Sequence, residues 1–206
     1  MRSPALIEYG QLGAALRGSR PVAAVRHPGF EPGEALPGAL DALVTAHVAA
    51  VRAVAGQERP VLLGRSAGGW VAHAVAERLA ADGSAPAALV LVDTYPHDAD
   101  GAGQSLSAMT SDMLRRVARS SSAVPHRLTA MAGYFELFAD RKPARLAAPT
   151  LYLRARDPLP GAEPTPPRSL THTEDIEVTV PGDHFTVLEE HARTTARAVH
   201  DWLADL

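Results

Sequence analysis

The stretch that decides the fold is Pro60-Val-Leu-Leu-Gly-Arg-Ser-Ala-Gly-Gly-Trp70. It begins with the apolar run Val61–Leu63, continues into a G-x-S-x-G pattern centred on Ser66, and leads into helical periodicity over Ala67–Ala81. Without these flanks the pattern would predict only a serine in a glycine-rich turn. With them it predicts a strand that turns directly into a helix, with Ser66 at the tip of the turn.

The glycines of this pattern have a steric role. A direct strand-to-helix turn holds Ser66 in strained backbone geometry, and we expect side chains at Gly64 and Gly68 to collide across it. The turn therefore pushes the Ser66 hydroxyl into a cleft. Because the helix that begins at Ala67 directs its first N–H groups to the same place, the Ala67 amide is a candidate oxyanion donor.

On both sides of this stretch, short apolar runs alternate with longer stretches of helical periodicity. This alternation predicts an α/β fold, with a mostly parallel sheet flanked by helices. The expected strands are Val22–Arg26, Val61–Leu63, Ala88–Val92, Thr150–Arg154 and Ile176–Val180. The expected helices are Leu6–Leu16, Leu36–Ala55, Ala67–Ala81, with a left-handed stop at Asp82-Gly83, and Val187–Leu203.

Composition limits the function classes. At 206 residues and 46% hydrophobic, the chain can bury one core, so we expect a single domain over residues 1–206. A net charge of −3 gives no basic field for nucleic acid or an anionic membrane. The chain has no cysteine, which fits a cytoplasmic location and excludes thiolate metal sites. No stretch has metal-ligand spacing, so we expect neither a metal nor another cofactor.

One segment, about residues 97–143, interrupts the alternation. It has no strand pattern, and its two amphipathic pieces, Leu106–Arg119 and Arg127–Phe138, are rich in Met and aromatic residues. We expect a helical insertion, which is either an extra pair packed on the core or a lid over a substrate channel. The proline-rich run Pro158–Pro167 predicts a surface loop.

A nucleophilic serine needs a base, and in the α/β-hydrolase fold that this turn predicts the order along the chain is serine, acid, histidine. Of nine histidines, His184 stands in Val180-Pro-Gly-Asp-His-Phe-Thr186, between the last strand and the last helix. A residue there can reach over the carboxyl edge of the sheet. We therefore predict His184 as the base.

Two aspartates compete for the role of the acid. Asp93 ends the run Ala88–Val92, and Asp157 follows the run Thr150–Arg154. Either position could reach His184, and the fold alone favours Asp157 because many α/β-hydrolases use the later strand. The residue that is not used would be a turn former at a strand end.

The chain resembles the terminal thioesterase domains of modular type I polyketide synthases. The resemblance extends from about Ser3 to the C-terminus. Its most distinctive motifs are Gly64-Arg-Ser-Ala-Gly-Gly69, Leu91-Val-Asp-Thr-Tyr-Pro96 and Val180-Pro-Gly-Asp-His-Phe-Thr186. Further matches include His27-Pro-Gly-Phe-Glu-Pro-Gly-Glu-Ala-Leu-Pro37 and Arg127-Leu-Thr-Ala-Met131.

The resemblance implies that the acid is Asp93 and that the insertion is a lid over an acyl channel. On that basis Tyr95, Met131 and Tyr134 become candidate channel residues. The family usually has histidine where this chain has Arg65, and we expect the Arg65 side chain to point away from the chemistry.

The resemblance also implies a function and its partners. We expect Ser66 to take an acyl chain from the phosphopantetheine arm of an acyl carrier protein, and to release it to water or to a hydroxyl of the same chain. The alternatives are a discrete editing (type II) thioesterase or esterase, and a non-catalytic module that binds the carrier protein. The family's first strands, the second oxyanion donor and the dimerisation helices would precede Ser3. We expect upstream residues that supply them, and a possible homodimer in the full-length protein.

Overall fold

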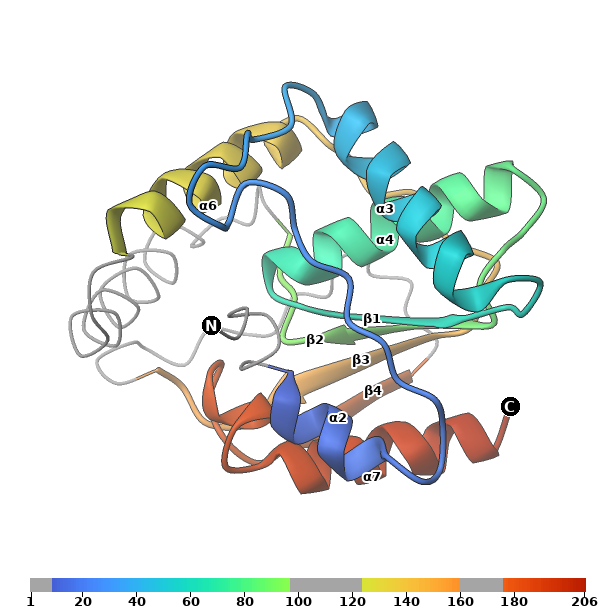
Figure 1. Cartoon of the computed structure of the whole chain (residues 1–206). Coiled ribbons are helices and arrows are strands. Elements are labelled where there is room, and N and C mark those ends of the chain that lie inside the picture. The colour runs from blue at the N-terminus through green and yellow to red at the C-terminus, as the bar shows by residue number, and fades with distance from the viewer. Residues whose placement is uncertain (1–8, 97–123, 160–175) are drawn as a thin grey trace.

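The computed structural model describes residues 9–96, 124–159 and 176–206 (Figure 1). Its centre is a parallel sheet in the order β1-β2-β3-β4. The strands are β1 (Val61–Arg65), β2 (Ala88–Val92), β3 (Thr150–Ala155) and β4 (Ile176–Val180). Four of the five expected strands are therefore present, and the expected α/β class with a mostly parallel sheet is confirmed.

Helices cover both faces of the sheet (Figure 1). One layer contains α3 (Leu40–Ala55), α4 (Ala67–Ala81) and α6 (Val124–Phe138). The other contains α2 (Gly10–Leu16) and α7 (Ala192–Ala204), with a short 3₁₀ turn η1 (Thr186–Leu188) leading into α7. The helix expected over Val187–Leu203 is thus two elements, because the chain between them turns at Glu189, where the backbone leaves helical geometry.

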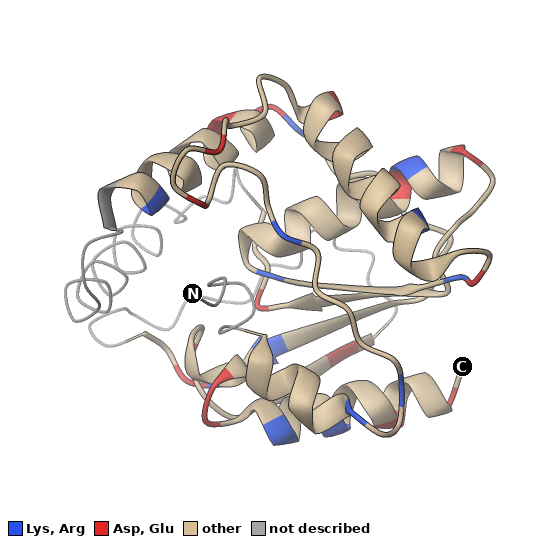
Figure 2. Ribbon diagram, in the orientation of Figure 1, with Lys and Arg blue, Asp and Glu red and all other residues tan. Residues whose placement is uncertain are grey.

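Strand alternation gives each helical layer its own core. Leu89 and Leu91 of β2 face α3, α4 and α6, whereas Val90 and Val92 of the same strand face α2 and α7. β2 is buried at every position, as expected for a strand of a parallel sheet that is covered on both faces. Charged residues lie mainly on the outer helices and loops (Figure 2).

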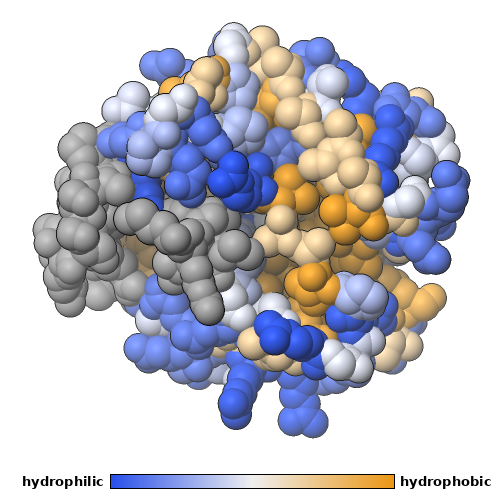
Figure 3. All heavy atoms as spheres, viewed as in Figure 1, coloured by the Kyte–Doolittle hydropathy of each residue, from blue (hydrophilic) through white to orange (hydrophobic). Residues whose placement is uncertain are grey.

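The strand expected over Val22–Arg26 is wrong. These residues belong to a connection that passes from the α2 layer to the α3 layer and crosses in front of the sheet (Figure 1). They form no ladder with any described strand, and Val22 is 52% exposed. The face of the molecule seen in Figure 3 carries a band of apolar residues. Apolar β-branched residues favour a strand only where a neighbouring strand supplies hydrogen bonds.

The second half of the expected insertion is helical and packs on the core. Tyr134 and Phe138 of α6 are buried, and the Trp70 ring of α4 lies 5.3 Å from Phe135 and 5.8 Å from Phe138. The other expected helix, Leu106–Arg119, lies outside the described residues. So does most of the proline-rich run Pro158–Pro167.

Candidate active site

Ser66 lies between β1 and α4 with φ 54° and ψ −130°. A positive φ is uncommon for a residue with a side chain, and it is the strained geometry that the sequence pattern predicts. The Ser66 N–H donates to the Val92 carbonyl at 3.0 Å, which ties the turn to the end of β2. The turn therefore holds the serine at the carboxyl edge of the sheet.

The glycines around Ser66 are required to different degrees. A Cβ on Gly64 would lie 2.2 Å from the Gly68 carbonyl oxygen, so this position admits no side chain. A Cβ on Gly69 would lie 2.1 Å from the Thr94 hydroxyl. At Gly68 the nearest atom is the Tyr9 hydroxyl at 3.3 Å. The collision expected at Gly64 is therefore confirmed. In α4, the position that admits no side chain is Gly69, whereas a Cβ at Gly68 would make only a close contact.

Ala67 is the first residue of α4. The first N–H groups of a helix have no partner within the helix, and the helix dipole makes this end attractive to negative charge. The geometry is thus compatible with the oxyanion donor expected from the sequence.

Asp93 follows β2 and is buried, with only 1% of its surface exposed. One carboxylate oxygen, Oδ1, accepts hydrogen bonds from the Tyr95 hydroxyl at 2.8 Å and the Ala155 N–H at 3.0 Å. The other, Oδ2, lies 2.7 Å from Nδ1 of His184. Burial opposes ionisation of the carboxyl, but these hydrogen bonds outweigh it and keep the pKa of Asp93 below its ordinary value. Asp93 is therefore an ionised acceptor.

His184 lies in the loop that follows β4 and is 5% exposed. Because an ionised carboxylate can only accept, Nδ1 of His184 carries the proton in this pair. In the neutral ring Nε2 is then the basic nitrogen. Ser66, Asp93 and His184 follow β1, β2 and β4, and the carboxyl ends of these parallel strands meet at one edge of the sheet.

Asp157 holds the turn before His184. Its carboxylate accepts from the Gly182 N–H at 3.1 Å and forms an ion pair with Arg156, while its own N–H donates to the Gly182 carbonyl at 2.9 Å. The side chain is 47% exposed, and its hydrogen bond with Arg156 lowers the pKa of this carboxyl. Of the two aspartates left open by the fold, the structure gives Asp93 the contact with the imidazole.

The Arg65 side chain does not point away from this region, contrary to expectation. Its Nη1 donates to the His184 carbonyl oxygen at 2.7 Å. The reason is strand alternation, which places Arg65 on the same face of β1 as Val61 and Leu63, toward the layer of α2 and α7. Sequence reasoning missed this contact, although the same alternation could have indicated it.

The three candidate channel residues have different surroundings. Tyr95 is half-buried, and its hydroxyl donates to Asp93. Burial, together with the negative charge of Asp93, raises the pKa of the phenol. Tyr134 is buried and donates to the Pro28 carbonyl at 3.0 Å. Met131 is half-buried on α6. A channel lined by them stays a prediction.

Sequence reasoning also missed a histidine pair close to the turn. Nδ1 of His27 lies 2.9 Å from Nε2 of His47, and Nδ1 of His47 lies 2.9 Å from the Leu43 carbonyl oxygen. Because that oxygen only accepts, His47 donates to it. Burial lowers the pKa of His47, so its ring stays neutral. Nε2 of His27 would lie 3.7 Å from a Cβ on Gly68, which places the pair beside the turn at Ser66.

Among residues 9–96, 124–159 and 176–206, no group of His, Asp and Glu is arranged to hold a metal ion. Within the same ranges, none of the helices has the length and apolar character needed to cross a membrane.

A parallel sheet between two helical layers, with a serine on a strained strand-to-helix turn, defines an α/β-hydrolase fold. The chain belongs to the thioesterase domain family, which it matches over residues 5–203.

Similar proteins of known sequence include polyketide synthases. The chain is 42% identical over 202 residues to polyketide synthase GfsE from Streptomyces halstedii, an alignment that covers 97% of this chain and 5% of GfsE. It is 37% identical over 211 residues to the spectinabilin polyketide synthase system protein NorC from Streptomyces orinoci, which covers 97% of this chain and 9% of NorC. The chain therefore spans less than a tenth of the length of these relatives.

Among solved structures, the NocB thioesterase domain in covalent complex with a fluorophosphonate nocardicin G analogue has the same fold. The TM-score is 0.74 at 21% identity, with 96% of this chain and 88% of that chain covered. This likeness confirms the α/β-hydrolase fold.

Proposed function

We propose that this domain releases acyl chains from an acyl carrier protein through a covalent intermediate on Ser66. The observation that carries the proposal is the buried hydrogen bond between Asp93 and Nδ1 of His184, at the edge of the sheet where the turn presents Ser66. It is the arrangement that orients a histidine as base for a serine nucleophile. The match to the thioesterase family over nearly the whole chain supports it.

In the first half of the reaction, Nε2 of His184 takes the proton of the Ser66 hydroxyl as its oxygen attacks the thioester carbonyl. The Ala67 N–H stabilises the negative charge that forms on the carbonyl oxygen. When the tetrahedral intermediate collapses, the carbon–sulfur bond breaks and His184 returns the proton to the thiolate of the phosphopantetheine arm. Asp93 stays ionised and stabilises the imidazolium in between.

In the second half, water or a hydroxyl of the acyl chain attacks the ester carbonyl, and His184 takes the proton of this nucleophile. When the intermediate collapses, the bond between the acyl carbon and the Ser66 oxygen breaks and His184 returns the proton to that oxygen. Water as the nucleophile gives a linear acid, and a hydroxyl of the acyl chain gives a macrolactone. The similarity to modular polyketide synthases supports a polyketide-type acyl chain and a carrier protein in the same polypeptide.

The test uses hydroxyacyl thioesters of N-acetylcysteamine with the purified chain. We expect a burst of thiol release, an acyl group on the peptide that contains Ser66, and no burst with Ser66→Ala. Chromatography of the products separates linear acid from lactone. A burst that survives Ser66→Ala would overturn the proposal. If the wild-type chain neither turns over thioesters nor reacts with a fluorophosphonate, the role of a non-catalytic carrier-binding module replaces it.

A further inference from the structure

Arg65 occupies an unusual position, because it is covalently next to the nucleophile and contacts the base. It is the last residue of β1 and directly precedes Ser66. β1 and β4 are the outermost strands of the described sheet, so their axes lie about 14 Å apart at the usual spacing of neighbouring strands. No backbone ladder joins them directly. A side chain that reaches from β1 to the loop after β4 therefore supplies a connection that the sheet does not.

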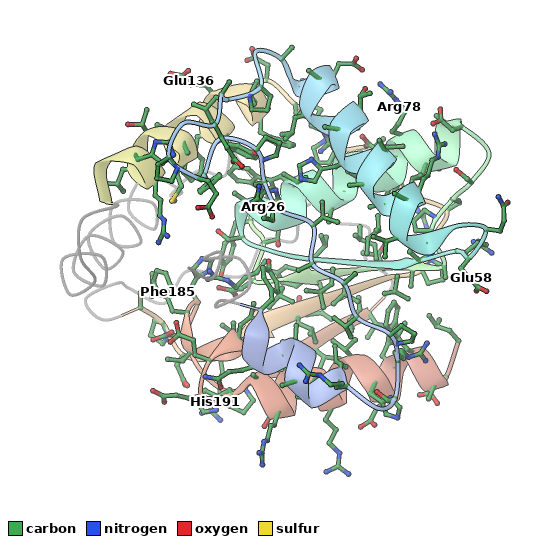
Figure 4. All side chains as sticks on the ribbon, viewed as in Figure 1. Arg26, Glu58, Arg78, Glu136, Phe185 and His191 are labelled. Carbon is green, nitrogen blue, oxygen red and sulfur yellow. The ribbon has the colours of Figure 1, made fainter. Side chains whose placement is uncertain are left out.

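The Arg65 side chain makes two contacts with that loop. Nη1 donates to the His184 carbonyl oxygen at 2.7 Å, and the guanidinium carbon lies 5.5 Å from the centre of the Phe185 ring. The Phe185 ring in turn meets the His184 imidazole edge to face, with ring centres 5.2 Å apart. A hydrogen bond from a charged donor is stronger than one from a neutral donor, and a cation–π contact is stronger when it is partly buried than when it is exposed. Phe185 lies at the end of the sheet opposite to Glu58 (Figure 4).

The rest of the loop is held by other means. On one side of His184, Gly182 is bound to Asp157 at the end of β3. On the other side, the Asp183 carboxylate accepts from the N–H groups of Phe185 and Thr186, each at 2.9 Å. The bonds of Gly182 thus connect the loop to the residues after β3, and the bonds of Asp183 are internal to the loop. The bond from Arg65 instead relates the backbone of His184 to the strand that carries Ser66.

We propose that Arg65 is a positioning residue that sets the distance between the His184 imidazole and the Ser66 hydroxyl. The inference rests on the proposed function, in which His184 is the base for Ser66. Without the Arg65 bond the imidazole keeps its partner Asp93, but its backbone is no longer tied to the nucleophile strand. Proton transfer is sensitive to such displacements, whereas binding of the acyl chain is not.

The decisive variants are Arg65→Met and Arg65→Lys. Methionine keeps an unbranched apolar side chain but removes the donors, and lysine keeps a charged donor. Arg59→Met is the matched control, because Arg59 also donates to carbonyl oxygens, those of Ala85 and Pro86 at 3.0 Å each, but precedes the other end of β1. Thermal unfolding of each purified chain shows which variants are folded.

With a thioester substrate we expect Arg65→Met to lower kcat about 10- to 100-fold, with KM within about threefold of wild type. Arg65→Lys should restore most of kcat, and Arg59→Met should leave both constants unchanged. If Arg65→Met does not fold, Arg65→Gln, whose amide is too short to span the same gap, should show the same loss of kcat.

The inference is overturned if a folded Arg65→Met or Arg65→Gln chain keeps kcat within about twofold of wild type, if KM rises and kcat does not fall, or if lysine gives no rescue. The two proposals fail separately. Absence of Ser66 acylation in the wild-type chain overturns the proposed function, whereas normal acylation in a folded Arg65→Met chain overturns only the role of Arg65.

Discussion

Asp93 and Asp157 end neighbouring parallel strands, yet their surroundings differ in every respect that matters for catalysis. Asp93 is buried, has φ 44°, and accepts three hydrogen bonds that include one from the His184 imidazole. Asp157 is half exposed and contacts Arg156 and the Gly182 backbone. Of these two carboxylates, only Asp93 contacts the imidazole, because the loop after β4 brings His184 to it. The Asp157 carboxylate instead holds the backbone of that loop at Gly182.

The largest expected effect comes from Asp93→Asn. An amide at this position can donate to Nδ1 and so favours the wrong tautomer of His184, with little change in shape. We expect kcat for thioester turnover to fall about 10³- to 10⁴-fold while the chain stays folded. Steady-state kinetics with circular dichroism as the folding control measures this. A fall of less than tenfold would remove Asp93 from the proposed role.

A smaller effect is expected from Tyr95→Phe, which removes one of the three hydrogen bonds to the Asp93 carboxylate. A hydrogen bond to a charged group is stronger than one between neutral groups. If it stabilises the transition state, its loss should lower kcat about tenfold. The pKa of Asp93 should rise toward its ordinary value. The matched comparison is Tyr134→Phe, which removes a phenol that donates to a backbone carbonyl instead. Equal kcat values for the two variants would contradict the prediction.

The Asp93 carboxylate should also affect how the free energy of unfolding depends on pH in acid. The pKa of Asp93 is lowered in the folded chain, so its contribution to stability is present above the ordinary pKa of 3.8 and is lost as pH falls through the lower, folded value. Between those values the wild-type chain should lose more unfolding free energy than Asp93→Asn does. Urea titrations at several pH values below 5 measure the difference. Parallel curves for the two proteins would show that the carboxylate contributes nothing there.

The smallest effect is expected from Asp157→Asn. The side chain is exposed, and asparagine can still accept from the Gly182 N–H, so kcat should stay within about twofold of wild type. Steady-state kinetics under the conditions used for Asp93→Asn gives a direct comparison. If Asp157→Asn abolished turnover and Asp93→Asn did not, the assignment of the two aspartates would be reversed, as in hydrolases that use the later strand.

Much of the fold follows from local patterns. The helix Ala67–Ala81 begins and ends where the sequence predicts, and Gly83 has the positive φ of a helix stop. The strand β2 coincides with a wholly apolar run because a parallel strand that is covered on both faces needs apolar residues at every position. Val22–Arg26 is also mainly apolar but forms no ladder. Pairing depends on a neighbour that the run itself does not specify.

The sequence by itself determined the turn at Ser66, because the strand, the glycines and the helix that force it lie within about twenty consecutive residues. It also placed His184 after the last strand. The pairing of His184 with Asp93 was implied by resemblance alone, and only the tertiary structure decided where the imidazole lies and that Arg65 contacts its backbone. These contacts join residues 91 and 119 positions apart, and their geometry depends on strand order and loop path, which no local pattern encodes.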